Sequence, residues 1–387
     1  RPGETALNGG AGDLTKSCYG GTGAPNHIGT TDLQKKFSDG ALVYADGTNS
    51  GIALDNIQIQ DNGTLTFSVS FADLSGQKLW ETSNNSSFSA DTMAYDLATA
   101  ADGTMYLLST TAYSATLYRV EEDETLTAVS KPFSGSMYNP KLVICDGMAY
   151  VLYQDYDYIS HLCKWNENGQ LWEECYVGTE LAQYQDLATD GEQLYFTCTT
   201  GSFPYLLQAY CYNPNTGQAT KIGTDLSGNA CNLEIAAADG TVVIGYRDLT
   251  ANSVPKAAIY NGATWNIITL SEQECGMVSV IAEEDGKFWV LPSGGKNPIF
   301  SMTSDGTATA YELPAALQEN VFQMVPVLSG GNLYVAVNSQ NPNAFDLYRL
   351  NQETASWETV GNTIANEIVN QPVLSARNGT IYCMYNA

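Results

Sequence analysis

The chain has 387 residues, of which 15% are charged and 44% hydrophobic, and it contains 35 glycines and 24 tyrosines, a mixture typical of a β-rich globular protein. Sixteen Lys and Arg residues against 42 Asp and Glu residues give a formal net charge of −26, which excludes nucleic acid and anionic membrane surfaces as partners. No apolar run approaches the roughly 20 residues that cross a bilayer, so we expect a soluble chain without membrane insertion. It begins at Arg1-Pro2, so we expect a processed or truncated N-terminus, and the composition favours an extracellular or cell-surface protein.

Residues 1–63 precede any repeat and are rich in Gly, Thr, Asn and Asp. They contain short strand-like runs at 41–45 and 57–60, and we expect an N-terminal β/loop appendage, followed by a second domain over 64–387.

A repeat of about 45 residues organises that second domain. In each repeat an apolar strand, a tight-turn dipeptide and an aromatic strand follow one another, which is typical of a β-hairpin. A third and a fourth strand complete the repeat, so four antiparallel strands recur as in a propeller blade. The turn dipeptides are Asp102-Gly103, Asp146-Gly147, Asp190-Gly191, Asp239-Gly240, Asp285-Gly286, Gly330-Gly331 and Asn378-Gly379.

Tryptophan marks the fourth strand in alternate repeats, at Trp80, Trp172, Trp265 and Trp357, at intervals of about 92 residues. GQKLWET, ending at Thr82, is similar to GQLWEEC, ending at Cys175, so residues 64–82 are predicted to be third and fourth strands without their own first two. Residues 370–387 hold only a first and a second strand. We therefore predict an all-β, seven-bladed β-propeller closed by N- and C-terminal strands in one blade. The alternative is an eight-bladed propeller that uses Asp61-Asn62-Gly63 as one more turn.

Two segments carry resemblances to known families. YNPNTGQATKIG from Tyr212 and LYRLNQETASWETVG from Leu347 resemble kelch-type propeller repeats, although the paired glycines of that family are absent. Residues 19–71, with NHIGTTDLQKKFSDG and DNIQIQDNGTLTFSVSF, resemble the β-rich segment after the catalytic domain of immune-inhibitor-A-type secreted metallopeptidases. That resemblance implies a C-terminal accessory region of a larger secreted protein. The HExxH motif of those peptidases is absent, so it implies no peptidase activity in this piece.

Polar residues recur where first strands begin, and first strands line the central channel of a propeller. Asp96 and Asp186 occupy equivalent DLAT motifs, and Glu234 follows in the next repeat. We predict that these acids share a channel mouth within reach of a ligand or one cation such as calcium, and we expect no other cofactor. The remaining predicted mouth residues are Asn139, Lys141, Gln323 and Gln371.

Aromatic residues gather in the predicted loops between second and third strands, which should share a face with that mouth. Tyrosine offers a flat apolar ring with a polar tip, which suits stacking on sugars or packing on a protein. The predicted loop contacts are Tyr113, Tyr156, Tyr158, Phe203, Tyr205 and Phe345.

Catalytic signatures are sparse, because the chain has only two histidines, His27 and His161, far apart and without companions at ligand spacing. Nine cysteines fall mostly in apolar strands; Cys163 with Cys175, and Cys198 with Cys211, could form disulfides across hairpins, or all could be buried thiols.

We therefore expect a monomeric, non-catalytic extracellular binding or scaffolding module with a glycan or a protein as ligand. The alternative is a polysaccharide hydrolase or lyase that uses Asp96, Asp186 or Glu234.

Overall fold

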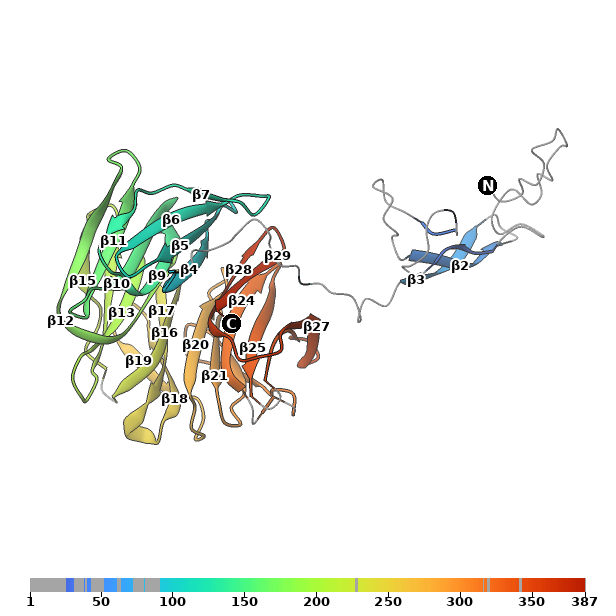
Figure 1. Ribbon diagram of the computed structural model, residues 1–387. Coiled ribbons are helices and arrows are strands. Elements are labelled where there is room, and N and C mark those ends of the chain that lie inside the picture. Colours follow the sequence, from blue (N-terminus) through green and yellow to red (C-terminus); the bar gives the residue numbers. More distant parts are fainter. Residues whose placement is uncertain are drawn as a thin grey trace. The chain divides into compact units, whose positions relative to one another are not determined.

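The computed structural model divides the chain into two compact units, Arg1–Lys78 and Leu79–Ala387, which are described separately (Figure 1). The structure describes residues 26–30, 38, 40–42, 52–60, 64–71, 80, 91–226, 229–315, 317–318, 321–340 and 343–386. Its elements are β-strands, with a 3-10 turn at Leu249–Ala251. Within these residues no helix is long and apolar enough to cross a membrane.

The first unit contains a three-stranded antiparallel sheet in the order β1-β2-β3. Its strands are β1 (Ile28–Gly29), β2 (Ile52–Ile59) and β3 (Leu65–Phe71). β3 pairs with β2 across a short connection, so residues 65–71 form a local hairpin here, whereas the sequence predicted them as the third strand of the last blade. The predicted run at 41–45 and the turn Asp61-Asn62-Gly63 lie wholly or partly outside the described residues.

The second unit begins with one sheet and continues with a larger one. The first has the order β4-β5-β6-β7, with β8 also paired to β6. A seven-stranded sheet follows, because β12 is shared by two sets of four strands. The strands are β4 (Ala94–Thr99), β5 (Met105–Thr110), β6 (Ser114–Val120), β7 (Leu126–Ala128), β8 (Phe133–Ser134), β9 (Tyr138–Cys145), β10 (Met148–Gln154), β11 (Ile159–Asn166), β12 (Leu171–Thr189), β13 (Leu194–Thr200), β14 (Leu207–Asn213) and β15 (Gln218–Lys221).

Three four-stranded antiparallel sheets and a two-stranded one complete this unit, in the orders β16-β17-β18-β19, β20-β21-β22-β23, β24-β25-β26-β27 and β28-β29. The all-β class and the recurring four-stranded sheets are confirmed. The strands are β16 (Ala230–Ala238), β17 (Thr241–Asp248), β18 (Val254–Tyr260), β19 (Trp265–Thr269), β20 (Met277–Ala282), β21 (Phe288–Ser293), β22 (Ile299–Met302), β23 (Ala308–Tyr311), β24 (Val321–Ser329), β25 (Asn332–Ser339), β26 (Ala344–Asn351), β27 (Ser356–Ala365), β28 (Asn370–Arg377) and β29 (Thr380–Asn386).

The predicted dipeptides connect the first and second strands of these sheets. At Asp146-Gly147 the φ angles are 49° and 71°, and at Asn378-Gly379 they are 51° and 81°. Two consecutive positive φ values define the type I′ turn, whose twist matches that of the flanking strands. At Asp102-Gly103, Asp190-Gly191 and Asp285-Gly286 only the Gly has a positive φ, so the feature common to these turns is a second residue that tolerates positive φ.

The core lies between neighbouring sheets, and β4, β9 and β16 run near the middle of the unit while β15 and β27 lie at its periphery (Figure 1). Leu117 of β6 packs with Val151 of β10, and Ala236 of β16 packs with Val290 of β21. Burial of these apolar faces against one another stabilises the stacked sheets by roughly 25 cal/mol per Å² removed from water.

The last sheet, β28-β29, contacts both the sheet β24-β25-β26-β27 and the first sheet of this unit, β4-β5-β6-β7. Trp80 packs against the cluster that holds Phe345 and Tyr385. On the other side, Ser375 Oγ lies 2.7 Å from Thr99 Oγ1. Arg377 donates hydrogen bonds to the carbonyl oxygens of Val120, at 2.6 Å, and Glu121, at 3.0 Å. The C-terminal hairpin therefore joins strands that are about 250 residues apart in the chain.

Candidate functional site

The beginnings of the first strands surround one cavity of about 400 Å³. Strands β4, β9, β12, β16, β20, β24 and β28 contact one another in that order, and β28 also contacts β4, so residues at equivalent positions converge. All seven predicted mouth residues line this cavity: Asp96, Asn139, Lys141, Asp186, Glu234, Gln323 and Gln371.

The three acids tie successive first strands together. Asp96 Oδ2 accepts the backbone N–H of Leu142 at 2.7 Å. Asp186 Oδ2 accepts that of Ile235 at 2.8 Å, and Glu234 Oε2 accepts that of Val280 at 3.1 Å. Each carboxylate thus satisfies a backbone donor of the neighbouring strand that no ladder reaches. The recurrence of acids at this position has a structural cause.

Lys141 supplies the positive charge of this cavity. Its Nζ lies 3.0 Å from Asp186 Oδ1, and the nearby carboxylates, Asp186 first, raise the pKa of the Lys141 ammonium. Three acids and one Lys leave an excess of acid in a half-buried space. Burial raises the pKa of Asp96 to about 6 and that of Glu234 to about 7, against the opposing effect of Lys141.

Glu234 also belongs to a hydrogen-bonded chain. Ser279 Oγ lies 3.2 Å from Glu234 Oε1 and 2.9 Å from the carbonyl oxygen of Met324. A hydroxyl has one hydrogen to donate. When the Ser279 hydroxyl donates to Met324, the Glu234 carboxyl completes the chain by donating its own proton to Ser279 Oγ. The chain is therefore fully paired when Glu234 is protonated, and the raised pKa of Glu234 has burial as its main cause.

Asn139 and Gln371, which line the cavity, and Asn232 of β16 lie in β-bulges. Asn139, Asn232 and Gln371 have φ angles of 47°, 47° and 48°, at places where the pairing of β9, β16 and β28 shifts register. Asn adopts this left-handed conformation more readily than most residues. Asn139 Nδ2 donates to Gln154 Oε1 at 2.8 Å, so the side chain also fixes β9 against β10.

Exposed aromatic residues lie at turns beside these strand beginnings. An antiparallel hairpin places the turn after the second strand next to the start of the first strand, and Tyr138 of β9 stacks on Tyr158 with ring centroids 6.5 Å apart. The exposed fractions are 84% for Tyr113, 79% for Tyr156 and 75% for Phe203. Tyr158 is exposed as well, and Tyr205 is half-buried with its ring edge against Phe203.

Phe345 corrects the sequence prediction, because this residue lies in β26 and is completely buried. Its ring packs edge-on against Tyr385 at 5.9 Å. The sequence predicted Phe345 in the loop that begins at Asn341, but it is the second residue of β26 and belongs to the core cluster between two sheets. It therefore belongs to the core and not to a binding face.

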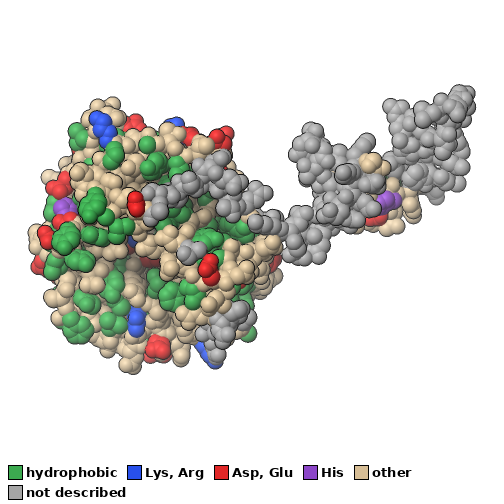
Figure 2. Space-filling model, in the orientation of Figure 1, with side chains coloured by type: hydrophobic (Ala, Val, Ile, Leu, Met, Phe, Trp, Pro, Cys, Tyr) green, Lys and Arg blue, Asp and Glu red, His purple; other side chains and the backbone are tan. Residues whose placement is uncertain are grey.

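Basic residues are the minority among the charged side chains of the chain, with 16 Lys and Arg against 42 Asp and Glu. Figure 2 shows hydrophobic side chains in patches over the second unit, with red acidic side chains among them and only scattered blue Lys and Arg side chains. With a formal net charge of −26, the chain as a whole repels strongly anionic ligands.

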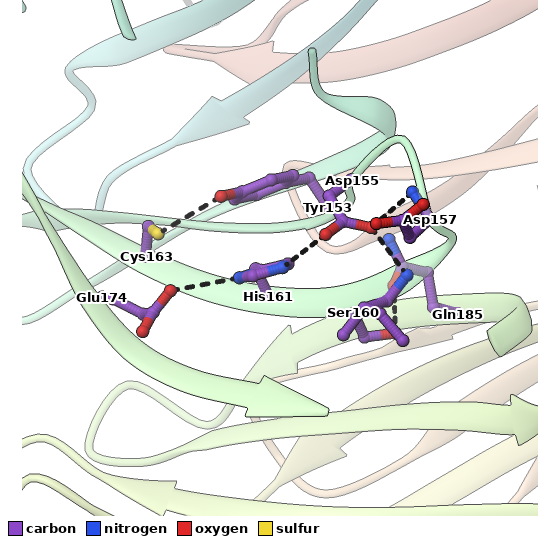
Figure 3. Close-up of polar contacts among 9 residues, drawn as sticks. Tyr153, Asp155, Asp157, Ser160, His161, Cys163, Glu174 and Gln185 are labelled. Atoms are coloured by element: carbon purple, nitrogen blue, oxygen red, sulfur yellow. Dashed lines mark hydrogen bonds and ion pairs between the residues drawn. The ribbon is translucent and has the colours of Figure 1, made fainter. Parts of the chain in front are cut away.

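Sequence reasoning missed a polar cluster next to one of these turns (Figure 3). His161 Nε2 lies 3.2 Å from Asp155 Oδ2, and His161 Nδ1 lies 3.2 Å from Glu174 Oε2. The imidazole stacks on Tyr153 with centroids 5.1 Å apart and planes 13° apart. The sequence indicates no companion for His161, because it does not show which residues of β12 lie beside β11; in the structure Glu174 lies opposite Cys163, two residues from His161.

The eight described cysteines are all free. Cys163 pairs with Glu174 and Cys198 pairs with Gln208, so neither predicted hairpin places its two thiols opposite each other. Cys18 lies outside the described residues. Over the described ranges, no three His, Cys, Asp or Glu side chains form a group able to hold a metal ion.

No protein-family model matches this chain, and no curated protein matches it. The resemblances to kelch-type repeats and to the metallopeptidase segment stay predictions.

Proposed function

We propose that this protein is a non-catalytic extracellular binding module that holds a glycan, or else a protein, against the aromatic turns around the cavity mouth. The observation that carries the proposal is the exposure of Tyr113, Tyr156 and Phe203, which come from turns of three successive sets of strands. An exposed aromatic ring at a turn does not pack in the core, whereas sugar rings and protein side chains stack on such rings.

We further propose that the sheets are the blades of a seven-bladed propeller. The contacts of β28 with both β24 and β4 support this arrangement. Trp80 packs on the last sheet's cluster, as expected if the stretch that carries it covers this blade. Residues 65–71 pair with β2 in the first unit and therefore do not complete this blade as the sequence predicted.

The cavity favours a neutral glycan over an acidic one. Asp96, Asp186 and Glu234 outnumber Lys141 at the mouth, and Lys141 is already paired with Asp186. A uronic acid or sulfate group would meet uncompensated negative charge there. Amide and carboxyl oxygens accept hydrogen bonds from sugar hydroxyls, and Gln323 and Gln371 line the same cavity.

One observation favours a second candidate, a glycoside hydrolase. A carboxyl group with a pKa near 7, such as Glu234, can act as a general acid, and Asp186 stands in the same cavity. The hydrogen bonds weigh against it: Glu234 Oε2 accepts the backbone N–H of Val280, and Asp186 is held by Lys141 and Ile235. We infer that carboxyl groups held by these contacts stabilise the fold and do not act in catalysis.

A glycan array together with a panel of extracellular proteins tests the proposal, with a reducing-sugar assay on the same glycans. We expect binding of a neutral glycan without release of reducing ends. Release of reducing ends that is lost in Glu234→Gln would establish the hydrolase instead. The absence of any glycan or protein ligand would contradict the binding proposal.

A further inference from the structure

The turn that carries Tyr156 and Tyr158 is organised by one carboxylate. Asp155 Oδ1 accepts the backbone N–H groups of Asp157 and Ile159, both at 2.9 Å. The backbone N–H of Tyr158 donates to the carbonyl oxygen of Asp155 at 3.1 Å. The rotation of the Asp155 side chain therefore influences the shape of the turn. A group that binds the second oxygen, Oδ2, fixes this rotation and with it the positions of Tyr156 and Tyr158.

The second oxygen of Asp155 is held by His161. The ring lies between two carboxylates, Asp155 from the turn and Glu174 from β12, with the Tyr153 ring of β10 against one face (Figure 3). Cys163, two residues along β11, makes its contact with the Tyr153 hydroxyl instead. The His161 side chain is only 14% exposed, so water competes weakly for its two nitrogens.

A histidine in this position can satisfy both carboxylates only when both nitrogens carry a proton. Neutral imidazole has one N–H donor, and its other nitrogen offers a lone pair. With carboxylates on both sides, that lone pair faces an acceptor oxygen at hydrogen-bonding distance. The imidazolium form donates on both sides, and such charge-assisted bonds are roughly twice as strong as neutral ones.

We propose that His161 is a positioning residue for the Asp155–Tyr158 turn, and that it holds the turn fully only as an imidazolium. This inference rests on the proposed function for its consequence, which is that ligand contact through Tyr156 and Tyr158 weakens as the pH rises. The imidazolium donates to both carboxylates, whereas the neutral ring leaves one of them without a donor.

Hydrogen exchange of the turn tests the inference without any ligand. Protection factors of the amides of Asp157 and Ile159, corrected for intrinsic exchange, are measured at pH 5.5 and pH 8. We expect roughly three- to tenfold lower protection at pH 8, the effect of one hydrogen bond. Residues 241–248 of β17 serve as the reference for changes that affect the whole unit. Equal protection of the turn at the two pH values would overturn the inference.

A matched variant separates this role from a merely structural one. In Glu174→Gln the substituted amide can donate to a neutral His161 Nδ1 while Nε2–H still donates to Asp155. The turn should then keep its protection at pH 8. His161→Gln should show no pH dependence at all. A parent-like pH dependence in Glu174→Gln would refute the role of His161.

The ligand experiment is independent of this one. If a glycan binds with the same affinity at both pH values while the turn loses protection, the regulatory consequence is wrong although the positioning role holds. If exchange follows the expected pattern and no ligand binds at either pH, the proposed function fails.

Discussion

Replacing Glu234 by glutamine should stabilise the protein at alkaline pH relative to the parent. The substituted amide can donate to Ser279 Oγ, which donates to the Met324 carbonyl oxygen, while its own oxygen accepts the N–H of Val280. It therefore reproduces the protonated carboxyl without the need for a proton.

The magnitude follows from the pKa of Glu234, which burial raises from 4.5 to about 7. Between these values the native protein keeps a proton that the unfolded chain has lost, so the free energy of unfolding falls as the pH rises through this window. A shift of about 2.5 pKa units corresponds to at most about 3.4 kcal/mol. Because Glu234 is half-buried at a cavity, screening reduces the expected effect to about 1 to 2 kcal/mol.

Urea denaturation of parent and variant at pH 4.5 and pH 8 measures this difference. We expect the variant to gain about 1 to 2 kcal/mol over the parent between these pH values. Asp96→Asn is the contrast, because both oxygens of Asp96 accept backbone N–H groups and an amide loses one of these acceptors. It should be less stable than the parent at pH 8. A Glu234→Gln variant whose stability relative to the parent does not change with pH would refute the reasoning.

Two further predictions concern packing and closure. Arg377→Ala should lower the free energy of unfolding by about 2 to 4 kcal/mol, because it leaves carbonyl oxygens of the first sheet of this unit unpaired. The control Arg349→Ala breaks an exposed ion pair and should lower it by less than about 1 kcal/mol. Equal losses for the two variants in denaturant titrations would contradict the closing role of Arg377. Phe345→Ala should cost about 3 to 5 kcal/mol, whereas Phe203→Ala should leave the thermal midpoint unchanged, and a marked loss of stability in the latter would show that Phe203 is part of the core.

Much of this architecture could be predicted from the sequence because the repeat fixes equivalent positions. Turn dipeptides with positive φ mark each hairpin, and the first-strand position of Asp96 and Asp186 follows from the repeat alone. Their hydrogen bonds to neighbouring strands could not be predicted, because they depend on how one sheet packs on the next. Phe345 was misplaced because nothing in its local sequence shows that β26 begins at Ala344.

The pairing of residues across hairpins was the other limit. Glu174 lies opposite Cys163 in the register that starts at Asn166 and Leu171, so it stands diagonally across the ladder from His161. The turn at 167–170 sets this register, and its residue types do not show which register it imposes. The same register places Glu174, and not Cys175, opposite Cys163. Residues 65–71 were predicted as a strand of the last blade but pair with β2, because the sequence of a strand does not specify which neighbour it pairs with.

Calorimetry with the strongest array ligand tests the central claim, which is that the aromatic turns form the binding face. The parent is compared with the double variant Tyr156→Ala, Phe203→Ala, and with Leu171→Ala, which removes an exposed apolar side chain at the opposite end of the strands. Stacking of one ring contributes about 1 kcal/mol. We predict at least tenfold weaker binding for the double variant and unchanged binding for Leu171→Ala. Equal affinity of the parent and the double variant would contradict the account.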